Sequence, residues 1–225
     1  MALPGQAGGT AVGEVLFGKE NPAGRLPFTV PAGDAQLPDY ADYRMEGRTY
    51  RFLKDAPEFP FGFGLSFSSF VYEDLVLEKT TLTAGEDLTL KVTVRNTSEV
   101  DGEDVVQVYL KDMESSVRTP LQQLVDFARV TVPAGQSKIV NLRVPAQWMR
   151  ITHEDGSQLF EAGHFEVHVG GSSPCARSLE LGASALCVGR FDVREWPGPL
   201  FQFFGTEDTR RHSHPFHAFA QLRPS

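Results

Sequence analysis

Hydrophobic and polar residues alternate through much of the chain, in the pattern typical of β-strands with one buried face. The clearest case is the segment 87–96, DLTLKVTVRN, where Leu88, Leu90, Val92 and Val94 share one face and polar residues occupy the other. Because successive side chains of a strand point to opposite faces, this segment is predicted to be a strand with its apolar face in a core.

Further segments of this kind follow, separated by residues that favour turns such as Ala134-Gly135, Asp155-Gly156 and Ala162-Gly163. The other expected strands are 71–79, 103–112, 127–132, 137–144, 164–171 and 177–184. Short strands with turns between them, and no pattern of helical length, predict two packed antiparallel sheets. The expected fold class is therefore mainly β, an immunoglobulin-like antiparallel β-sandwich.

The first thirty residues have a different character. Residues 8–17 place Ala11, Val12, Val15 and Leu16 on one helical stripe and are followed by glycine, which predicts a short amphipathic helix. Residues 25–30 predict a brief strand interrupted by proline. One helix and one interrupted strand cannot bury a core of their own, so we expect this part to be the last piece of an α/β layer.

The stretch 60–70, PFGFGLSFSSF, joins these two parts. Gly62 and Gly64 can adopt positive φ angles and so permit a sharp bend. The phenylalanines of the stretch provide apolar surface to hold that bend against a neighbouring layer. We expect a fixed corner here rather than a flexible linker.

Tyrosine and arginine gather in the segment before this corner. The cluster comprises Tyr40, Tyr43, Arg44, Glu46, Arg48, Tyr50 and Arg51. Such residues are common where a loop covers a polar cleft or a domain interface. Two interpretations stay open: a linker held by Arg–carboxylate pairs and aromatic stacking, or a direct contact with a ligand. The residues expected to be near a substrate or at a domain contact are Tyr43, Glu46, Arg48 and Tyr50.

Charge and composition limit the partners. With 225 residues and a formal net charge of -8, the chain has no run of Lys or Arg to bind phosphates, so nucleic acid and anionic membranes are not expected. It contains neither an apolar run long enough to span a membrane nor the basic start and apolar core of a signal peptide. The only cysteines, Cys175 and Cys187, flank a segment expected to be extended and are predicted to be free thiols.

The sequence gives little support for a catalytic or a metal site. His164, Glu166 and His168 fall on one face of an expected strand, where a solvated surface is favoured over a metal site. The cluster of His212, His214 and His217 lies in a segment, 189–225, without periodicity. No nucleophile elbow or phosphate-binding glycine motif is present. We expect no metal and no cofactor.

Several motifs, in order, nevertheless resemble those of glycoside hydrolase family 3, the β-glucosidases and β-xylosidases. GTAVGEVLFGKENPAGRLPFTVP resembles the end of the family's α/β sandwich domain, and MEGRTYRF with PFGFGLSFSSF resembles its connector. VRNTSEVDGEDVVQVYL, LVDFARVTVPAG and EAGHFEVHVGG are similar to its terminal fibronectin type III-like domain. The resemblance covers about residues 4–185, and GRTYRF is more similar to the β-xylosidase branch.

The resemblance implies a retaining mechanism with an aspartate nucleophile and a glutamate acid/base, whose carboxyls lie about 5 Å apart. In the family these residues belong to an N-terminal barrel and to the α/β domain, upstream of the motifs found here. No catalytic residue is therefore assigned to this chain, and we expect it to be inactive alone. Its expected partners are the barrel and α/β domain of a family 3 glycosidase, or an oligosaccharide.

The resemblance also implies a domain organisation. Residues 1–35 are expected to be a remnant of the α/β sandwich domain, 36–66 a connector, 67–188 a fibronectin type III-like domain and 189–225 an unassigned, poorly packed tail. The leading hypothesis is the C-terminal fragment of a retaining β-glycosidase acting on terminal β-linked sugars, with this chain as scaffold. The alternative is a carbohydrate-binding or structural β-sandwich module without catalysis.

Overall fold

The computed structural model describes residues 5–195, and they form two stacked β-sheets with an extended N-terminal segment. The helical elements are α1 (Gly8–Leu16), η1 (Asp34–Gln36), α2 (Thr49–Phe52), η2 (Ala146–Met149) and α3 (Ala176–Glu180). The strands are β1 (Phe70–Leu77), β2 (Thr81–Thr83), β3 (Leu88–Asn96), β4 (Gly102–Asp112), β5 (Gln123–Val132), β6 (Ser137–Val144), β7 (Arg150–Thr152), β8 (Gln158–Phe160), β9 (Gly163–Gly170) and β10 (Cys187–Arg194).

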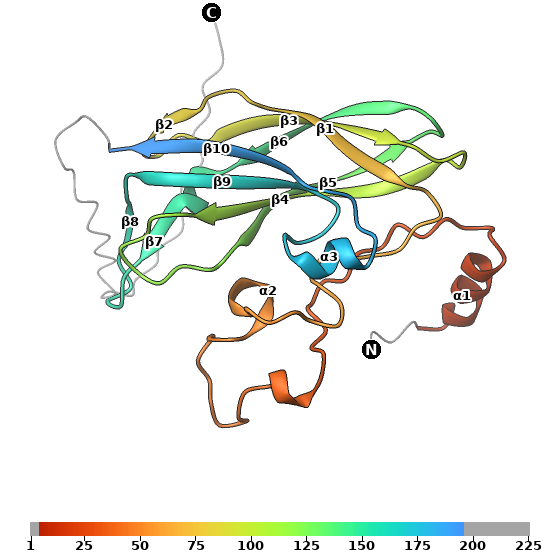
Figure 1. Ribbon diagram of the computed structural model, residues 1–225, viewed down its shortest axis with the longest axis horizontal. Helices are drawn as coiled ribbons and strands as arrows, with labels where there is room; N and C mark the ends of the chain where they lie inside the picture. The colour runs from red at the N-terminus through yellow and green to blue at the C-terminus, as the bar shows by residue number, and fades with distance from the viewer. Residues whose placement is uncertain (1–4, 196–225) are drawn as a thin grey trace, which may run out of the picture.

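The strands confirm the expected β-sandwich (Figure 1). One sheet has the order β1-β3-β6 and the other β2-β10-β9-β4-β5, while β7 and β8 form a separate hairpin. All the pairings are antiparallel except that of β2 with β10, which is parallel. Such layered sheets bury the inner faces of both partners.

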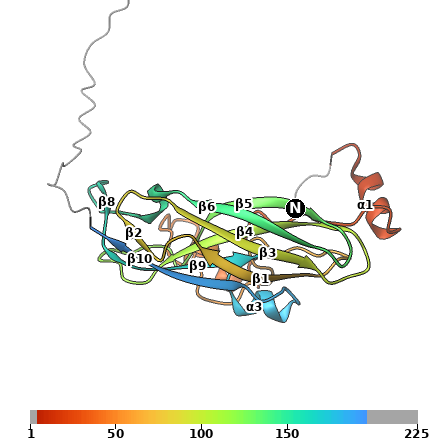
Figure 2. The same ribbon diagram turned by 90° about the horizontal axis from the view of Figure 1, so that it is seen from above.

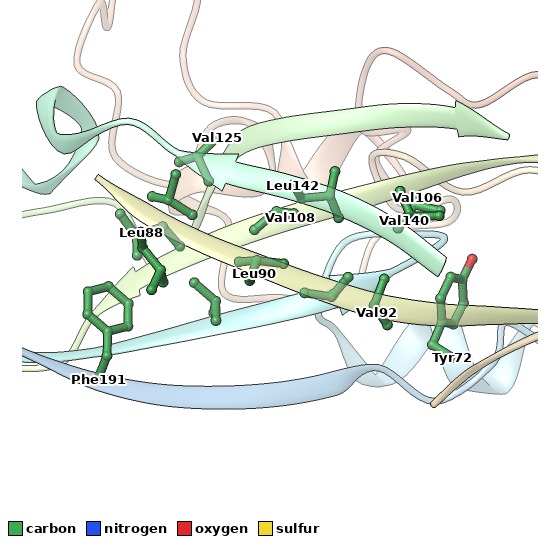
Figure 3. Packing of buried hydrophobic residues seen from close by; sticks show 14 of the residues in the cluster. Tyr72, Leu88, Leu90, Val92, Val106, Val108, Val125, Val140, Leu142 and Phe191 are labelled. Carbon is green, nitrogen blue, oxygen red and sulfur yellow. The ribbon is translucent and has the colours of Figure 1, made fainter. Parts of the chain in front are cut away.

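The core lies between the two sheets, where apolar side chains from both inner faces meet (Figure 3). Leu88, Leu90, Val92 and Val94 of β3 are all buried, as their alternation predicts. Their counterparts in the larger sheet are Val106, Val108, Leu110, Phe165, Val167, Val169, Phe191 and Val193. Burial of apolar surface at roughly 25 cal/mol per Å² makes this layer the main stabilising element of the fold.

The segment before β1 runs along the outside of the sandwich, drawn in red and orange in Figure 1. Figures 1 and 2 both place α1 at one end of the molecule, apart from the strands. Helix α1 confirms the expected amphipathic helix. No helix among residues 5–195 is long and apolar enough to cross a membrane.

Two expected strands are wrong, and the segment between the cysteines differs from its expected extended conformation. Residues 25–30 form no strand, because only Val30 makes a β-bridge, to Phe59. Residues 177–184 are not a strand: α3 occupies their first part, and a turn with Gly182 at φ 91° follows. The two cysteines are indeed free, but the chain between them is folded rather than extended.

The expected end of the ordered domain is also wrong. Residues 189–194 lie inside β10, which pairs with β9 and β2. Phe191 and Val193 belong to the core, so this strand is an integral part of the sandwich. Residues 196–225, including His212, His214 and His217, lie outside the described residues.

Candidate functional site at the connector

The connector (residues 36–66) is attached to the outer face of the larger sheet by aromatic contacts. The Tyr50 ring stacks on Phe61 at 4.1 Å between centroids and meets Tyr109 of β4 edge-on at 5.9 Å. The Tyr50 hydroxyl accepts a hydrogen bond from the Leu124 amide at 3.1 Å. Tyr50 therefore fixes the connector to two strands at once, as expected for a pinned segment.

Gln107 makes a second attachment point between the connector and the sheet. Its amide nitrogen donates to the carbonyls of Gly62, at 3.0 Å, and Gly171, at 2.8 Å, while its oxygen accepts from the Tyr109 hydroxyl at 2.5 Å. Burial raises the pKa of Tyr109, so the phenol stays protonated and able to donate. The hydrogen bonds of this polar side chain thus join the connector, at Gly62, to two positions of the sandwich, Gly171 and Tyr109.

Gly62 is required at this attachment point. Its φ is 76°, as expected for a sharp bend, and a Cβ there would lie 2.1 Å from the Gln107 side-chain oxygen. Of the phenylalanines in the corner, Phe61, Phe63 and Phe70 are partly or fully buried. The fourth phenylalanine, Phe67, is exposed, so it does not hold the corner as the sequence predicts.

A buried ionic contact joins the segment before the connector to the sandwich. The Arg25 guanidinium donates to the Asp104 carboxylate, which also accepts from the Tyr72 hydroxyl and, at 2.8 Å, from the Val105 amide. Burial, reinforced by the Asp104 charge, raises the pKa of Tyr72 well above its ordinary value, so its hydroxyl remains a donor. The contact links both sheets and the N-terminal segment through one carboxylate.

The remaining residues of the Tyr/Arg cluster brace the connector itself. Arg48 donates from Nε to the Arg44 carbonyl at 2.9 Å and also to the Asp42 carbonyl. The side-chain hydrogen bond from Arg44 lowers the pKa of Asp42. These contacts fit a linker held by local polar pairs.

Glu46 and Tyr43 complete the predicted set. Glu46 pairs with Arg118 of the sandwich at 3.0 Å, with both side chains well exposed. Tyr43 is 86% exposed. The structure thus brings Glu46 and Tyr50 to the sandwich, places Arg48 within the connector, and leaves Tyr43 in solvent.

A cavity of about 480 Å³ lies between the connector and the sandwich. Tyr50 and Phe61 line it together with the cationic side chains Lys54, Lys111 and Arg177. Asp55 is the one carboxylate among its described lining residues, so this cavity does not supply the carboxyl pair that glycoside hydrolysis requires.

The face of β9 that carries the predicted histidines is solvated at His164 and closed at Glu166. The side chain of His164 is 63% exposed, whereas those of His168 and Glu166 are 16% and 11% exposed. Glu166 is buried and contacts His168 Nε2 at 3.2 Å and Arg190 Nε at 2.9 Å, while His164 Nδ1 lies 2.6 Å from Asp192. Within residues 5–195, no three His, Cys, Asp or Glu side chains are grouped as metal ligands. Ion pairs between neighbouring strands explain this cluster.

The residues that attach the N-terminal segment and the connector to the sandwich were mostly not predicted from the sequence. Arg25 is separated from Asp104 by 79 positions, and Gln107 from Gly62 by 45. The usable signal was the polar Gln107 within the apolar run VVQVYL, because a polar residue in a buried strand needs a partner.

Comparison with known protein families gives two matches. Residues 1–67 match the glycosyl hydrolase family 3 C-terminal domain, and residues 104–173 match a fibronectin type III-like domain.

Curated proteins and solved structures agree with these matches. Xylan 1,4-beta-xylosidase of Xylanibacter ruminicola is 38% identical over 171 residues, which cover 76% of this chain and 19% of that protein. Periplasmic beta-glucosidase of Salmonella typhimurium is 33% identical over 178 residues, which cover 74% of this chain and 23% of that protein. A β-glucosidase structure from Erythrobacter marinus has a TM-score of 0.69 at 31% identity and covers 83% of this chain and 24% of that one. The chain spans about a fifth to a quarter of the length of the curated relatives it matches.

Proposed function

Because this chain is the C-terminal part of a glycoside hydrolase family 3 protein, with its fibronectin type III-like domain, we propose that it is the scaffold of a retaining β-glycosidase. The enzyme hydrolyses terminal β-linked sugars, and its aspartate nucleophile and glutamate acid/base belong to the barrel and the α/β domain. Residues 1–35 form the edge of the α/β domain, 36–66 the connector, and the sandwich extends from residue 67 to the end of β10.

One observation carries this proposal: α1 presents apolar side chains to solvent. Leu16 is 77% and Phe17 86% exposed, and Val12 is exposed on the same helix. The matched family domain includes this helix. A contiguous exposed apolar surface is typical of an interaction site. Its partner is the remainder of the α/β domain and barrel, which would cover the helix.

The connector residues act at this domain contact. Tyr50 is packed on the sandwich, Glu46 pairs with Arg118, and Arg48 braces the loop. Tyr43 then projects from a fixed base toward a neighbouring domain or a bound sugar. Amphipathic aromatic side chains suit both roles.

The substrate class is a β-xyloside or β-glucoside. A relative named as a β-xylosidase is 38% identical to this chain and one named as a β-glucosidase is 33% identical. The sugar-binding pocket is expected mainly in the barrel, so this chain sets the position of domains rather than the choice of sugar.

Assays of the purified chain with 4-nitrophenyl β-D-xyloside and β-D-glucoside test the scaffold role. We expect no turnover above the blank, because the reacting carboxylates are not supplied by this chain. Turnover that is abolished by substituting one of the chain's own carboxylates would overturn the proposal.

A further inference from the structure

A second cavity, of about 280 Å³, lies at the end of the sandwich near the β7–β8 hairpin. Residues of α2, the end of β4, the start of β5, η2, β7 and β8 line it. This cavity shares no lining residue with the 480 Å³ cavity at the connector.

The lining of the cavity combines apolar and polar side chains. Leu110, Met149, Ile151 and Phe165 line it and are buried, and Trp148, which is 37% exposed, lines it with them. The polar lining consists of Arg51, Asp112, Arg118, Thr119, Gln123, Gln147, Arg150, Thr152 and Gln158. A ligand that fits must offer an apolar face and a ring of groups that both donate and accept hydrogen bonds.

Two of the three cations in the lining are already engaged. Arg118 pairs with Glu46 at 3.0 Å and lies over the Phe52 ring at 5.8 Å. Arg150 lies over the Phe160 ring at 4.8 Å. A phenylalanine ring does not neutralise a guanidinium, so Glu46 compensates only Arg118, and Asp112 in the lining offsets one further charge. One positive charge is left in excess, and a mixed lining of this kind suits a neutral molecule with several hydroxyls.

Arg51 and Asp112 have hydrogen-bonding capacity to spare. Arg51 donates to Gln123 at 3.1 Å, but its Nε is closed from solvent and has no acceptor among the described residues. Burial raises the pKa of Asp112, and the charges of Glu161 and Glu114 add to this. Its carboxylate accepts one hydrogen bond, from the Glu114 amide at 3.1 Å. The free carboxylate oxygen of Asp112 and the remaining terminal N–H groups of Arg51, rather than its enclosed Nε, would pair with the hydroxyls of a ligand.

We propose that this cavity is a binding site for one neutral pyranose ring. A pyranose has C–H faces that stack on an indole and hydroxyls around its edge that pair with amides, a guanidinium and a carboxylate. The volume lies near the lower limit of about 300 Å³ for small-molecule sites, which restricts the ligand to a single ring. The site does not depend on the scaffold role and adds a carbohydrate-binding function to it.

Titration of the full chain with methyl β-D-xylopyranoside and methyl β-D-glucopyranoside, followed by backbone amide NMR, tests the site. We expect saturable shifts in residues 147–152 and 158 with a dissociation constant of about 1–10 mM. Trp148→Ala should weaken binding at least about tenfold. Trp148→Phe keeps an aromatic face and should weaken glycoside binding less than Trp148→Ala does. It also provides the test if the alanine variant folds poorly.

Phe127→Ala is the matched control, because Phe127 is an exposed aromatic on β5 that does not line the cavity. It should bind both glycosides as the unmodified chain does. Sorbitol, an acyclic polyol, should cause no saturable shift. The proposal is wrong if neither glycoside binds at up to about 50 mM, if sorbitol gives the same shifts, or if Trp148→Ala and Trp148→Phe leave binding unchanged. These results leave the scaffold proposal unaffected, so the two can fail separately.

Discussion

Arg25 and Asp104 form a buried ion pair between the N-terminal segment and strand β4, across 79 positions of the sequence. The side chain of Arg25 is 13% exposed and that of Asp104 only 1%. A buried carboxylate without a cationic partner is costly. The sandwich is therefore more stable when the N-terminal segment is in place and Arg25 pairs with Asp104.

Removal of the Arg25 charge should therefore destabilise the protein. Arg25→Met leaves Asp104 buried with only the Tyr72 hydroxyl and a backbone amide, and we expect a loss of about 3 kcal/mol in the free energy of unfolding. Urea denaturation followed by circular dichroism measures it. Arg95→Met is the control, because Arg95 pairs with Glu73 on the surface and its loss should cost much less than the loss of Arg25. Equal losses for the two variants would contradict the role assigned to Arg25.

Gly62→Ala should loosen the connector. The left-handed backbone and the clash with Gln107 together predict a loss of about 2–4 kcal/mol in the free energy of unfolding. Gly135→Ala shares a positive φ, 66°, but its Cβ would meet no atom within 4 Å, so it should cost only about 1–2 kcal/mol. Comparison of the two variants by thermal denaturation separates the clash from the backbone effect. A Gly62→Ala variant no less stable than Gly135→Ala would show that Gln107 moves aside freely.

The apolar surface of α1 should cause self-association of the isolated chain. Substitution of Leu16 and Phe17 by serine removes exposed apolar area, so we expect a larger monomer fraction in sedimentation velocity. The free energy of unfolding should change by less than about 0.5 kcal/mol, since both residues are at the surface. Ile139→Ser, at an exposed position on β6, is the control and should leave the monomer fraction unchanged. An equal effect of the control would mean that association does not involve α1.

His168 and His164 should make opposite contributions to the pH dependence of stability. Burial lowers the pKa of His168 despite the neighbouring Glu166, and Lys111 and Arg190 lower it further. The unfolded chain then binds a proton more readily than the folded one. Stability from this group is present above the ordinary pKa of about 6.5 and is lost as the pH falls toward the folded value.

For His164 the sign is reversed. The hydrogen bond with Asp192, together with the charge of Glu114, raises its pKa, so its contribution is present below about 6.5 and is lost as the pH rises. Urea denaturation at about pH 5 and about pH 8 should show His168→Gln reducing the acid loss of stability and His164→Gln increasing it. Shifts of the same sign in both variants would contradict these assignments.

The comparison of strand β3 with helix α3 shows where sequence reasoning holds and where it fails. The alternation in β3 extends over nine residues, and all four of its predicted core side chains are buried. Residues 177–184 alternate too, but Ala176, Arg177 and Leu179 have good helix propensity and Gly182 provides a helix end. A short pattern is therefore compatible with both structures, and packing decides between them.

Strand β10 was missed for a related reason. Its apolar positions Phe191 and Val193 follow Gly189 and stand between polar residues, which gives a signal of only two alternations. The strand forms because β9 and β2 offer edges on both sides. Both partner strands lie far from β10 in the sequence, so the local propensity of residues 187–194 does not reveal these pairings.

The sequence by itself determined the β-sandwich, the amphipathic helix α1 and the bend at Gly62, because each depends on neighbouring residues and their backbone preferences. Only the tertiary structure decided that Arg25 meets Asp104, that Gln107 holds the connector, and that Trp148 lies beside Arg51 and Asp112 around one cavity. These contacts join residues that are far apart along the chain, and they exist only where the packed sheets bring them within hydrogen-bonding distance.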